Sequence, residues 1–149
     1  MPAECAVTVD RRSVPPETAE GFQRALAAAV REATDAPVGV EMTLTERESP
    51  FFEAFSTDPD HEFVSAVAGA ARTATDAAGL ASGRGGAVRP FGAATEASYF
   101  APTPTVVFGP GDLADDAGAV AHAEREYVRV REVEAAAVTV AGVVDRVVG

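Results

Sequence analysis

Apolar and polar residues alternate along two short stretches near the start of the chain. Residues 3–10 and 38–44 each place every second side chain on an apolar face, which is the period of a half-buried strand. Between these stretches, a pair of prolines suits a helix entrance and apolar residues recur at helical spacing, which predicts a helix over about 17–33. The pattern therefore predicts a β-α-β unit.

The alternation stops over 49–57, where proline and phenylalanine residues replace it, and we expect the chain to pass there from one structural unit to another. Asp58 followed by Pro59 is typical of a helix N-cap and first helical position, and the apolar spacing that follows predicts a helix ending near Gly79. The connection 49–57 thus separates a first unit, 1–48, from a second unit, 58–149.

The second unit ends in two further predicted elements. Residues 105–108 form a short apolar run closed by a Gly-Pro-Gly turn, which is typical of a buried strand. Valine and alanine recur with a helical period over 133–147, which predicts a C-terminal helix. Helices alternating with strands in this way indicate the α/β fold class.

The charge balance excludes several partners. The chain carries 12 Lys+Arg, all of them arginine, against 23 Asp+Glu, for a formal net charge of −11. This charge would repel a phosphate backbone or an anionic lipid surface, so we expect neither nucleic acid nor a membrane as a partner. Arginine without lysine and many acidic residues favour a halophilic source over an ordinary acidic protein.

One cysteine, Cys5, rules out a disulfide within the chain and a cysteine-based zinc cluster. The first residues have neither the basic nor the apolar segment of a signal peptide, and no apolar run reaches ~18 residues. We therefore expect a cytoplasmic protein.

Two histidines are the main candidates for chemistry. His61 lies between two carboxylates at the start of a predicted helix, where we expect a solvated surface residue. His122 follows a glycine-rich loop that itself follows a predicted strand, and α/β proteins place ligands in such loops. From the residues alone, a structural role and a ligand role both stay open for His122.

Two other features can each be interpreted as purely structural or as functional. The segment Gly109-Pro110-Gly111-Asp112 is either a turn or a backbone amide pocket for a carboxylate or oxyanion. The arginine pair at 11–12 either clamps a substrate carboxylate or makes surface ion pairs. The sequence contains no G-x-S-x-G, P-loop, G-x-G-x-x-G or H-E-x-x-H motif, so serine hydrolase and nucleotide-binding functions lack support.

Five short motifs, taken in order, resemble one family. They are VDRRSVPPET at 9–18, ATEA at 94–97, PTVVFGPGD at 104–112, AH at 121–122 and EYV at 126–128. The chain resembles the C-terminal part of the dinuclear zinc hydrolases that include succinyl-diaminopimelate desuccinylase, acetylornithine deacetylase, aminoacylase and glutamate carboxypeptidase. The resemblance implies a metallopeptidase-like deacylase acting on N-acyl amino acids or small peptides, with two zinc ions, or cobalt in their place.

The resemblance also implies a fold and a set of site residues. Residues 1–48 would be the β-α-β half of a ferredoxin-like lid and dimerisation domain, and 58–149 the C-terminal segment of a zinc-peptidase-like catalytic domain. The implied roles fall on six residues: His122 as a zinc ligand, Gly109 and Gly111 at the substrate carboxylate pocket, Thr95 and Glu96 at the site wall, and Arg12 near the substrate or the dimer interface.

Most of the family's metal ligands and its general base lie in segments with no counterpart here, and Ala123-Glu124-Arg125 stands where the family has Thr-Pro-Asp. The resemblance therefore implies a chain that is incomplete on its own, with a missing N-terminal catalytic half as partner and a homodimer formed through the lid. The alternative is a non-catalytic truncated relative that acts as a dimerisation or binding module.

Overall fold

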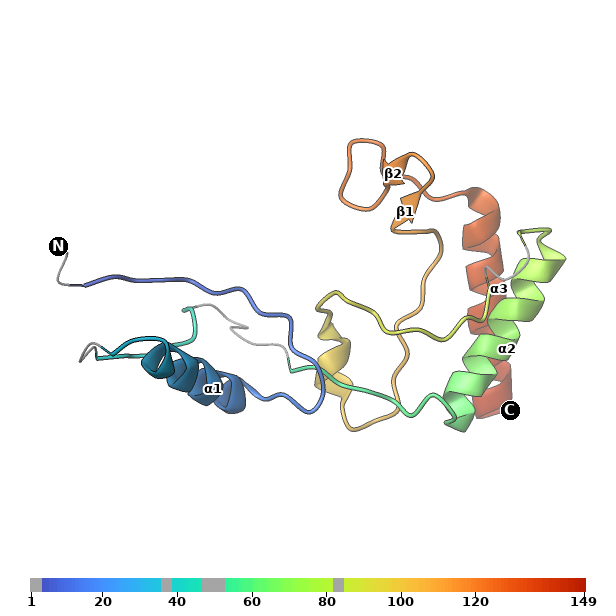
Figure 1. Ribbon diagram of the computed structural model, residues 1–149. Coiled ribbons are helices and arrows are strands. Elements are labelled where there is room, and N and C mark those ends of the chain that lie inside the picture. The colour runs from blue at the N-terminus through green and yellow to red at the C-terminus, as the bar shows by residue number, and fades with distance from the viewer. Residues whose placement is uncertain (1–3, 36–38, 47–52, 82–84) are drawn as a thin grey trace. The chain divides into compact units, whose positions relative to one another are not determined.

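The computed structural model describes residues 4–35, 39–46, 53–81 and 85–149 (Figure 1). It contains both helices and a small antiparallel sheet. The elements are α1 (Ala19–Glu32), α2 (Glu62–Ala77), the short 3-10 helix η1 (Glu96–Phe100), β1 (Ala114–Asp115), β2 (Gly118–Ala119) and α3 (Val130–Val148).

The chain forms two compact units. The first comprises Met1–Ser56 and Gly92–Pro102, and the second comprises Thr57–Phe91 and Thr103–Gly149. The segment 92–102 therefore leaves the second unit and returns to the first. Each unit is described by itself below.

In the first unit, α1 confirms the helix predicted over 17–33. Thr18 is its N-cap, and the Thr18 hydroxyl accepts a hydrogen bond from the backbone N–H of Gly21 at 3.1 Å. On one face, Ala27 is buried, and the side-chain amide of Gln23 donates to the carbonyl of Met42 at 3.4 Å. This contact holds the segment 39–46 beside the helix.

The two strands predicted in the first unit are wrong within the described residues. Residues 4–10 and 39–46 belong to no strand, while residues 3 and 38 lie outside the described part, as do 49–52 of the predicted connection. A strand exists only where a neighbour completes its hydrogen-bond ladder, and the described part of the first unit offers no such neighbour. Alternation alone does not supply one.

The second unit is built on the pairing of α2 with α3, and these helices confirm the two predicted over 58–79 and 133–147. The buried apolar side chains are almost all small, which lets helix axes approach closely. They are Val64, Ala66, Val67, Ala71, Ala74, Val120 and Ala135. Thr139 is 1% exposed, and its hydroxyl is satisfied by the Ala135 carbonyl at 2.8 Å.

Helix α2 begins three residues later than predicted, because His61 rather than Asp58 is its N-cap. The Nδ1 atom of His61 accepts a hydrogen bond from the backbone N–H of Phe63 at 3.1 Å. Asp58 instead accepts from the N–H of Asp60 at 2.9 Å, which closes a turn ahead of the helix. His61 is half-buried, and its ring is engaged as the helix cap rather than only solvated.

The end of α2 and the loop after it depend on two glycines with positive φ. Gly79 has φ +65°, and its N–H and that of Leu80 donate to the carbonyls of Asp76 and Thr75, at 3.1 and 3.0 Å. This is the Schellman arrangement that terminates a helix. Gly86 has φ +75° and lies directly against the carbonyl of Ala68 on α2, so the chain passes over the helix at close range.

The buried strand predicted over 105–108 is also wrong: these residues belong to no strand, and Val107 and Phe108 are each 42% exposed. The hydroxyl of Thr57 donates to the Thr105 carbonyl at 2.7 Å and accepts from the Thr105 N–H at 2.9 Å. One side chain thus meets the backbone groups that a neighbouring strand would otherwise pair. Among the described residues, no helix has the length and apolarity needed to cross a membrane.

Candidate functional site

The segment between 112 and 130 concentrates the polar side-chain contacts of the second unit. It starts with a hairpin in which Ala114 pairs with Ala119 and Asp115 with Gly118. The carbonyl of Leu113 accepts from the N–H of Val120 at 2.9 Å, and Val120 is 3% exposed. A buried anchor therefore lies immediately before the turn that carries His122.

Arg125 closes this segment from its other end. Its guanidinium donates Nη1 to Oδ2 of Asp115 at 2.9 Å and Nη2 to Oδ1 at 2.5 Å, so the ion pair is bidentate. Nη2 also donates to the carbonyl of Gly118 at 2.9 Å. We call this Asp115–Arg125 ion pair the clamp. It ties Arg125 back to the hairpin. A bidentate pair fixes geometry as well as distance, so the loop between is held at both ends.

The clamp is continuous with the start of α3. The hydroxyl of Tyr127 donates to Oδ2 of Asp115 at 2.9 Å, and Nη2 of Arg129 donates to the Tyr127 hydroxyl oxygen at 3.2 Å. The Arg129 guanidinium lies 5.2 Å from the Tyr127 ring centroid, a cation–π distance. Its Nη1 also donates to Glu132 at 3.1 Å, and the other carboxylate oxygen of Glu132 accepts from the N–H of Arg129 at 3.1 Å. Helix α3 therefore starts from a side-chain network.

The pKa of Asp115 is held well below its ordinary value of 3.8. The main cause is the hydrogen bonding from Arg125, followed by the backbone N–H of Ala117, which donates to Oδ1 at 2.8 Å. Reciprocally, the hydrogen bond to Asp115 raises the pKa of Arg125. Both groups are partly exposed, so the clamp fixes local geometry more than it adds to global stability.

This pKa shift predicts the pH response of the loop. A depressed pKa means that the ionised clamp stabilises the folded loop above pH 3.8, and that this contribution is lost only as the pH falls through the lower folded-state value. We expect the NMR amide shift of Ala117 to titrate with a midpoint well below 3.8, and to stop titrating in Asp115→Asn. A wild-type midpoint near 4 would contradict the clamp.

His122 lies within the clamped segment and has the one positive φ, 59°, of the described non-glycine residues. It is the third residue of a turn closed by the N–H of Ala123 and the carbonyl of Val120 at 3.4 Å. Glycine or asparagine normally fills such a position, because a left-handed backbone costs other residues roughly 1–2 kcal/mol. The imidazole is exposed.

The two candidate glycines of the second unit differ in their surroundings. Gly111 has φ +84°, and a Cβ there would meet the Val128 side chain at 3.4 Å. Gly109 is exposed, and a Cβ there would meet nothing within 4 Å. The positive φ explains glycine at 111, while nothing in the described structure demands it at 109.

The other candidates lie in the first unit. Nη1 of Arg12 donates to the carbonyl of Gly92 at 2.8 Å, which ties the returning segment 92–102 to the N-terminal segment. Thr95 caps η1 and accepts from the N–H of Ala97 at 3.2 Å, and Glu96 is exposed in the first turn. Arg12, Thr95 and Glu96 therefore share one unit, whereas the glycines and His122 belong to the other.

A zinc site needs three or four ligands, and the described residues do not bring them together. Within 4–35, 39–46, 53–81 and 85–149, no three His, Cys, Asp or Glu side chains are grouped to hold a metal ion. The Nδ1 of His61 is engaged as a helix cap. His122 is thus a candidate for a single ligand, and the described part of this chain does not fit a zinc centre by itself.

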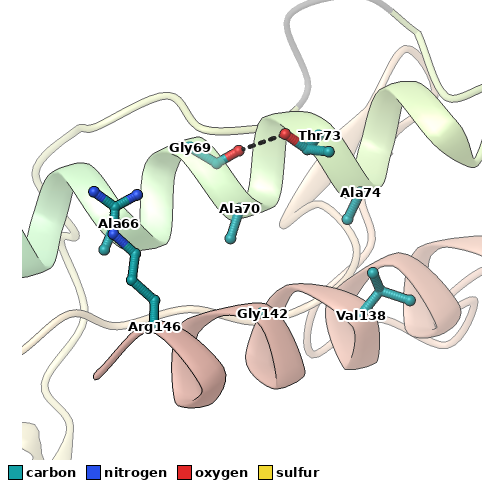
Figure 2. Close-up of a pocket in the computed structure, with 8 residues that line it drawn as sticks. All are labelled: Ala66, Gly69, Ala70, Thr73, Ala74, Val138, Gly142 and Arg146. Atoms are coloured by element: carbon teal, nitrogen blue, oxygen red, sulfur yellow. Dashed lines mark hydrogen bonds between the residues drawn. The ribbon is translucent and has the colours of Figure 1, made fainter. Parts of the chain in front are cut away.

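A groove of about 430 Å³ runs between α2 and α3 (Figure 2). Ala66, Ala70 and Ala74 project from α2 toward α3, and Arg146 lies at one end of the groove. Thr73 turns its hydroxyl back to the Gly69 carbonyl at 3.1 Å. The lining is small and mostly apolar, with Thr73 and Arg146 as its polar side chains, and it lacks the convergent polar groups that orient a small ligand.

The chain matches no protein-family model, no curated protein and no solved structure. Its site is therefore defined by its own geometry. His122 could be selected from the sequence, but the clamp could not, because Asp115 and Arg125 are ten residues apart and only the hairpin brings them together. The one sequence signal for the clamp is Arg125, a basic residue two positions before Tyr127 in a segment rich in acidic residues.

Proposed function

We propose that this chain is the C-terminal portion of a zinc-dependent amidohydrolase or metallopeptidase of the deacetylase or desuccinylase type. Its substrates would be N-acyl amino acids or small peptides, and the chain would be incomplete on its own. In this proposal, 1–48 is half of a ferredoxin-like lid, and 58–149 completes a zinc-peptidase-like catalytic domain whose remaining part comes from a separate segment.

The observation that carries the proposal is the backbone of His122. A left-handed non-glycine residue is retained only where the surroundings enforce it, and such residues cluster at functional sites. Here the surroundings are the buried Val120 on one side and the clamp at Arg125 on the other. The result is an exposed imidazole on a loop held at both ends, which is what a metal ligand requires.

The chain's own residues have limited and definite roles in this proposal. His122 supplies one zinc ligand, and the missing catalytic half supplies the others together with the general base. Zinc would contribute an activated water and a polarised carbonyl. The amides around Gly109 and Gly111, with Arg12 from the lid, would bind the substrate carboxylate, and Thr95 and Glu96 would border the site.

The test is reconstitution with the upstream half of the enzyme, encoded next to this chain or in a longer precursor. We expect the reconstituted complex to bind zinc and to hydrolyse an N-acetyl amino acid. His122→Ala should weaken zinc binding by more than the ~10–100-fold loss that is typical when a residue hydrogen-bonded to a metal ligand is replaced. Turnover should fall in parallel. Zinc content by mass spectrometry is measured separately from activity.

His61→Ala is the matched control, because it removes the other histidine at a helix cap. It should lower the free energy of unfolding by about 1 kcal/mol and leave zinc content unchanged. Full zinc occupancy in His122→Ala, or zinc loss in His61→Ala, would refute the assignment. Turnover by the isolated, purified chain would show that it does not need a missing half.

A second candidate function, a non-catalytic dimerisation or binding module, is favoured by α3. Val140, Val144 and Val147 on this helix are 53%, 51% and 61% exposed. An apolar helix face that the rest of the unit leaves uncovered is typical of an interaction surface. This candidate needs no metal.

A further inference from the structure

The hydroxyl of Tyr127 joins the clamp to the start of α3. It donates to Oδ2 of Asp115 at 2.9 Å and accepts from Nη2 of Arg129 at 3.2 Å. A carboxylate can only accept and a guanidinium can only donate, so the two neighbours fix the direction of both hydrogen bonds. Each bond has one ionised partner, which strengthens it, and the bonds of such a chain polarise one another. The hydroxyl therefore links the order of Asp115 to that of Arg129.

The first turn of α3 depends on this chain of bonds because its N-cap residue is Arg129. An arginine side chain has no acceptor, so it cannot bind the free N–H groups of the first turn as Ser, Thr, Asp or Asn would. Glu132 supplies order instead: its carboxylate accepts from the N–H and from Nη1 of Arg129, both at 3.1 Å. Glu132 is 7% exposed, and a buried carboxylate that loses its cationic partner is costly. Whatever holds Arg129 in place therefore also holds the start of the helix.

The carboxylate that receives the Tyr127 hydroxyl also holds the loop around His122. We define the His122 loop as residues 113–126. Asp115 accepts two bonds from Arg125 across this loop, at 2.9 and 2.5 Å. One carboxylate thus carries the contacts that close the loop and the contact that leads to α3. Removing its charge acts on both.

We propose that the His122 loop and the first turn of α3 open and close as one cooperative unit, with the Tyr127 hydroxyl as the link between them. Coupling between two sites is reciprocal. A ligand that favours the closed loop therefore orders the start of α3, and a contact that orders the start of α3 closes the loop. The chain thereby carries a device that transmits binding at a surface loop to a helix that packs on α2. The proposal does not depend on the hydrolase function.

Amide hydrogen exchange of the full chain tests the coupling, because it reports the opening of each element separately. The N–H of Val120, bonded to the Leu113 carbonyl, reports on the loop, and the N–H of Val133, bonded to the Arg129 carbonyl, reports on the first turn of α3. Asp115→Asn should speed exchange of both amides roughly tenfold, the effect of losing a hydrogen bond to a charged group. Unchanged exchange at Val133 would overturn the proposal.

Tyr127→Phe tests whether the effect passes through the hydroxyl, since this variant keeps the ring and removes one oxygen atom. By itself it should speed exchange at Val133. In the Tyr127→Phe background, Asp115→Asn should still speed exchange at Val120 but should change exchange at Val133 by less than about twofold. If the two substitutions multiply their effects at Val133, they act independently and the link is wrong.

Asp116→Asn is the matched control, because it removes the same charge from the exposed neighbouring residue of the same hairpin. It should change exchange at both reporting amides by less than about twofold, as expected for a surface site outside the network. An effect equal to that of Asp115→Asn would assign the result to net charge and overturn the proposal.

The amide of Thr139, which is buried in the middle of α3, distinguishes local opening from general destabilisation. It should exchange at an unchanged rate in Asp115→Asn. If Thr139 also exchanges faster, Arg125→Lys repeats the test with a milder change, because it keeps the charge and loses the paired donors. Failure of Arg125→Lys to speed exchange at Val133 more than at Thr139 would then overturn the proposal.

Discussion

Gly86→Ala should lower the free energy of unfolding by about 3 kcal/mol. The φ of +75° costs a side chain roughly 1–2 kcal/mol, and a Cβ would sit 2.3 Å from the Ala68 carbonyl oxygen. The clashing group is backbone within α2, so relief requires the loop to lift away from the helix. Denaturant unfolding followed by circular dichroism measures the change.

Gly79→Ala separates the two causes. Gly79 has a similar φ of +65°, but a Cβ there would meet nothing within 4 Å. This variant should therefore lower the free energy of unfolding by only about 1 kcal/mol, the cost of placing a side chain on a left-handed backbone. If both alanine variants cost the same, the close passage of the loop over α2 would be wrong.

Ala135→Leu should be the second most damaging change, lowering the free energy of unfolding by about 2 kcal/mol. Ala135 is 5% exposed, within a core of small side chains on α2 and α3. Because Ala135 is almost fully buried, three additional carbons must displace neighbouring side chains or push the helices apart. Thermal and denaturant unfolding at low micromolar concentration measure the effect on the monomer.

Ala137→Leu is the control for size and helix propensity, because the same substitution falls on the exposed face of α3. Its side chain is exposed, so we expect a change of less than about 0.5 kcal/mol in the monomer. A loss of stability as large as that of Ala135→Leu would show that this face of α3 is already covered within the chain.

The histidines illustrate how far residue types alone can assign a role. The motif around His122 indicated a presented ligand, and the structure adds a left-handed backbone enforced from both sides. His61 had no motif, and its role as a helix cap depends on its Nδ1 meeting the N–H of Phe63. Cap geometry depends on how the chain enters the helix, which composition does not specify.

The sequence by itself determined the three long helices, because apolar residues recur at helical spacing along each of them. It did not determine which face is buried: on α3 the predicted apolar face is the exposed one, with Val140 and Val147 53% and 61% exposed. Only the tertiary structure decided that the described parts of the alternating segments, 4–10 and 39–46, form no ladder, since a strand needs a hydrogen-bonding partner that can lie far along the chain. It likewise decided the clamp and the close passage of Gly86, because both join atoms that sequence spacing does not bring together.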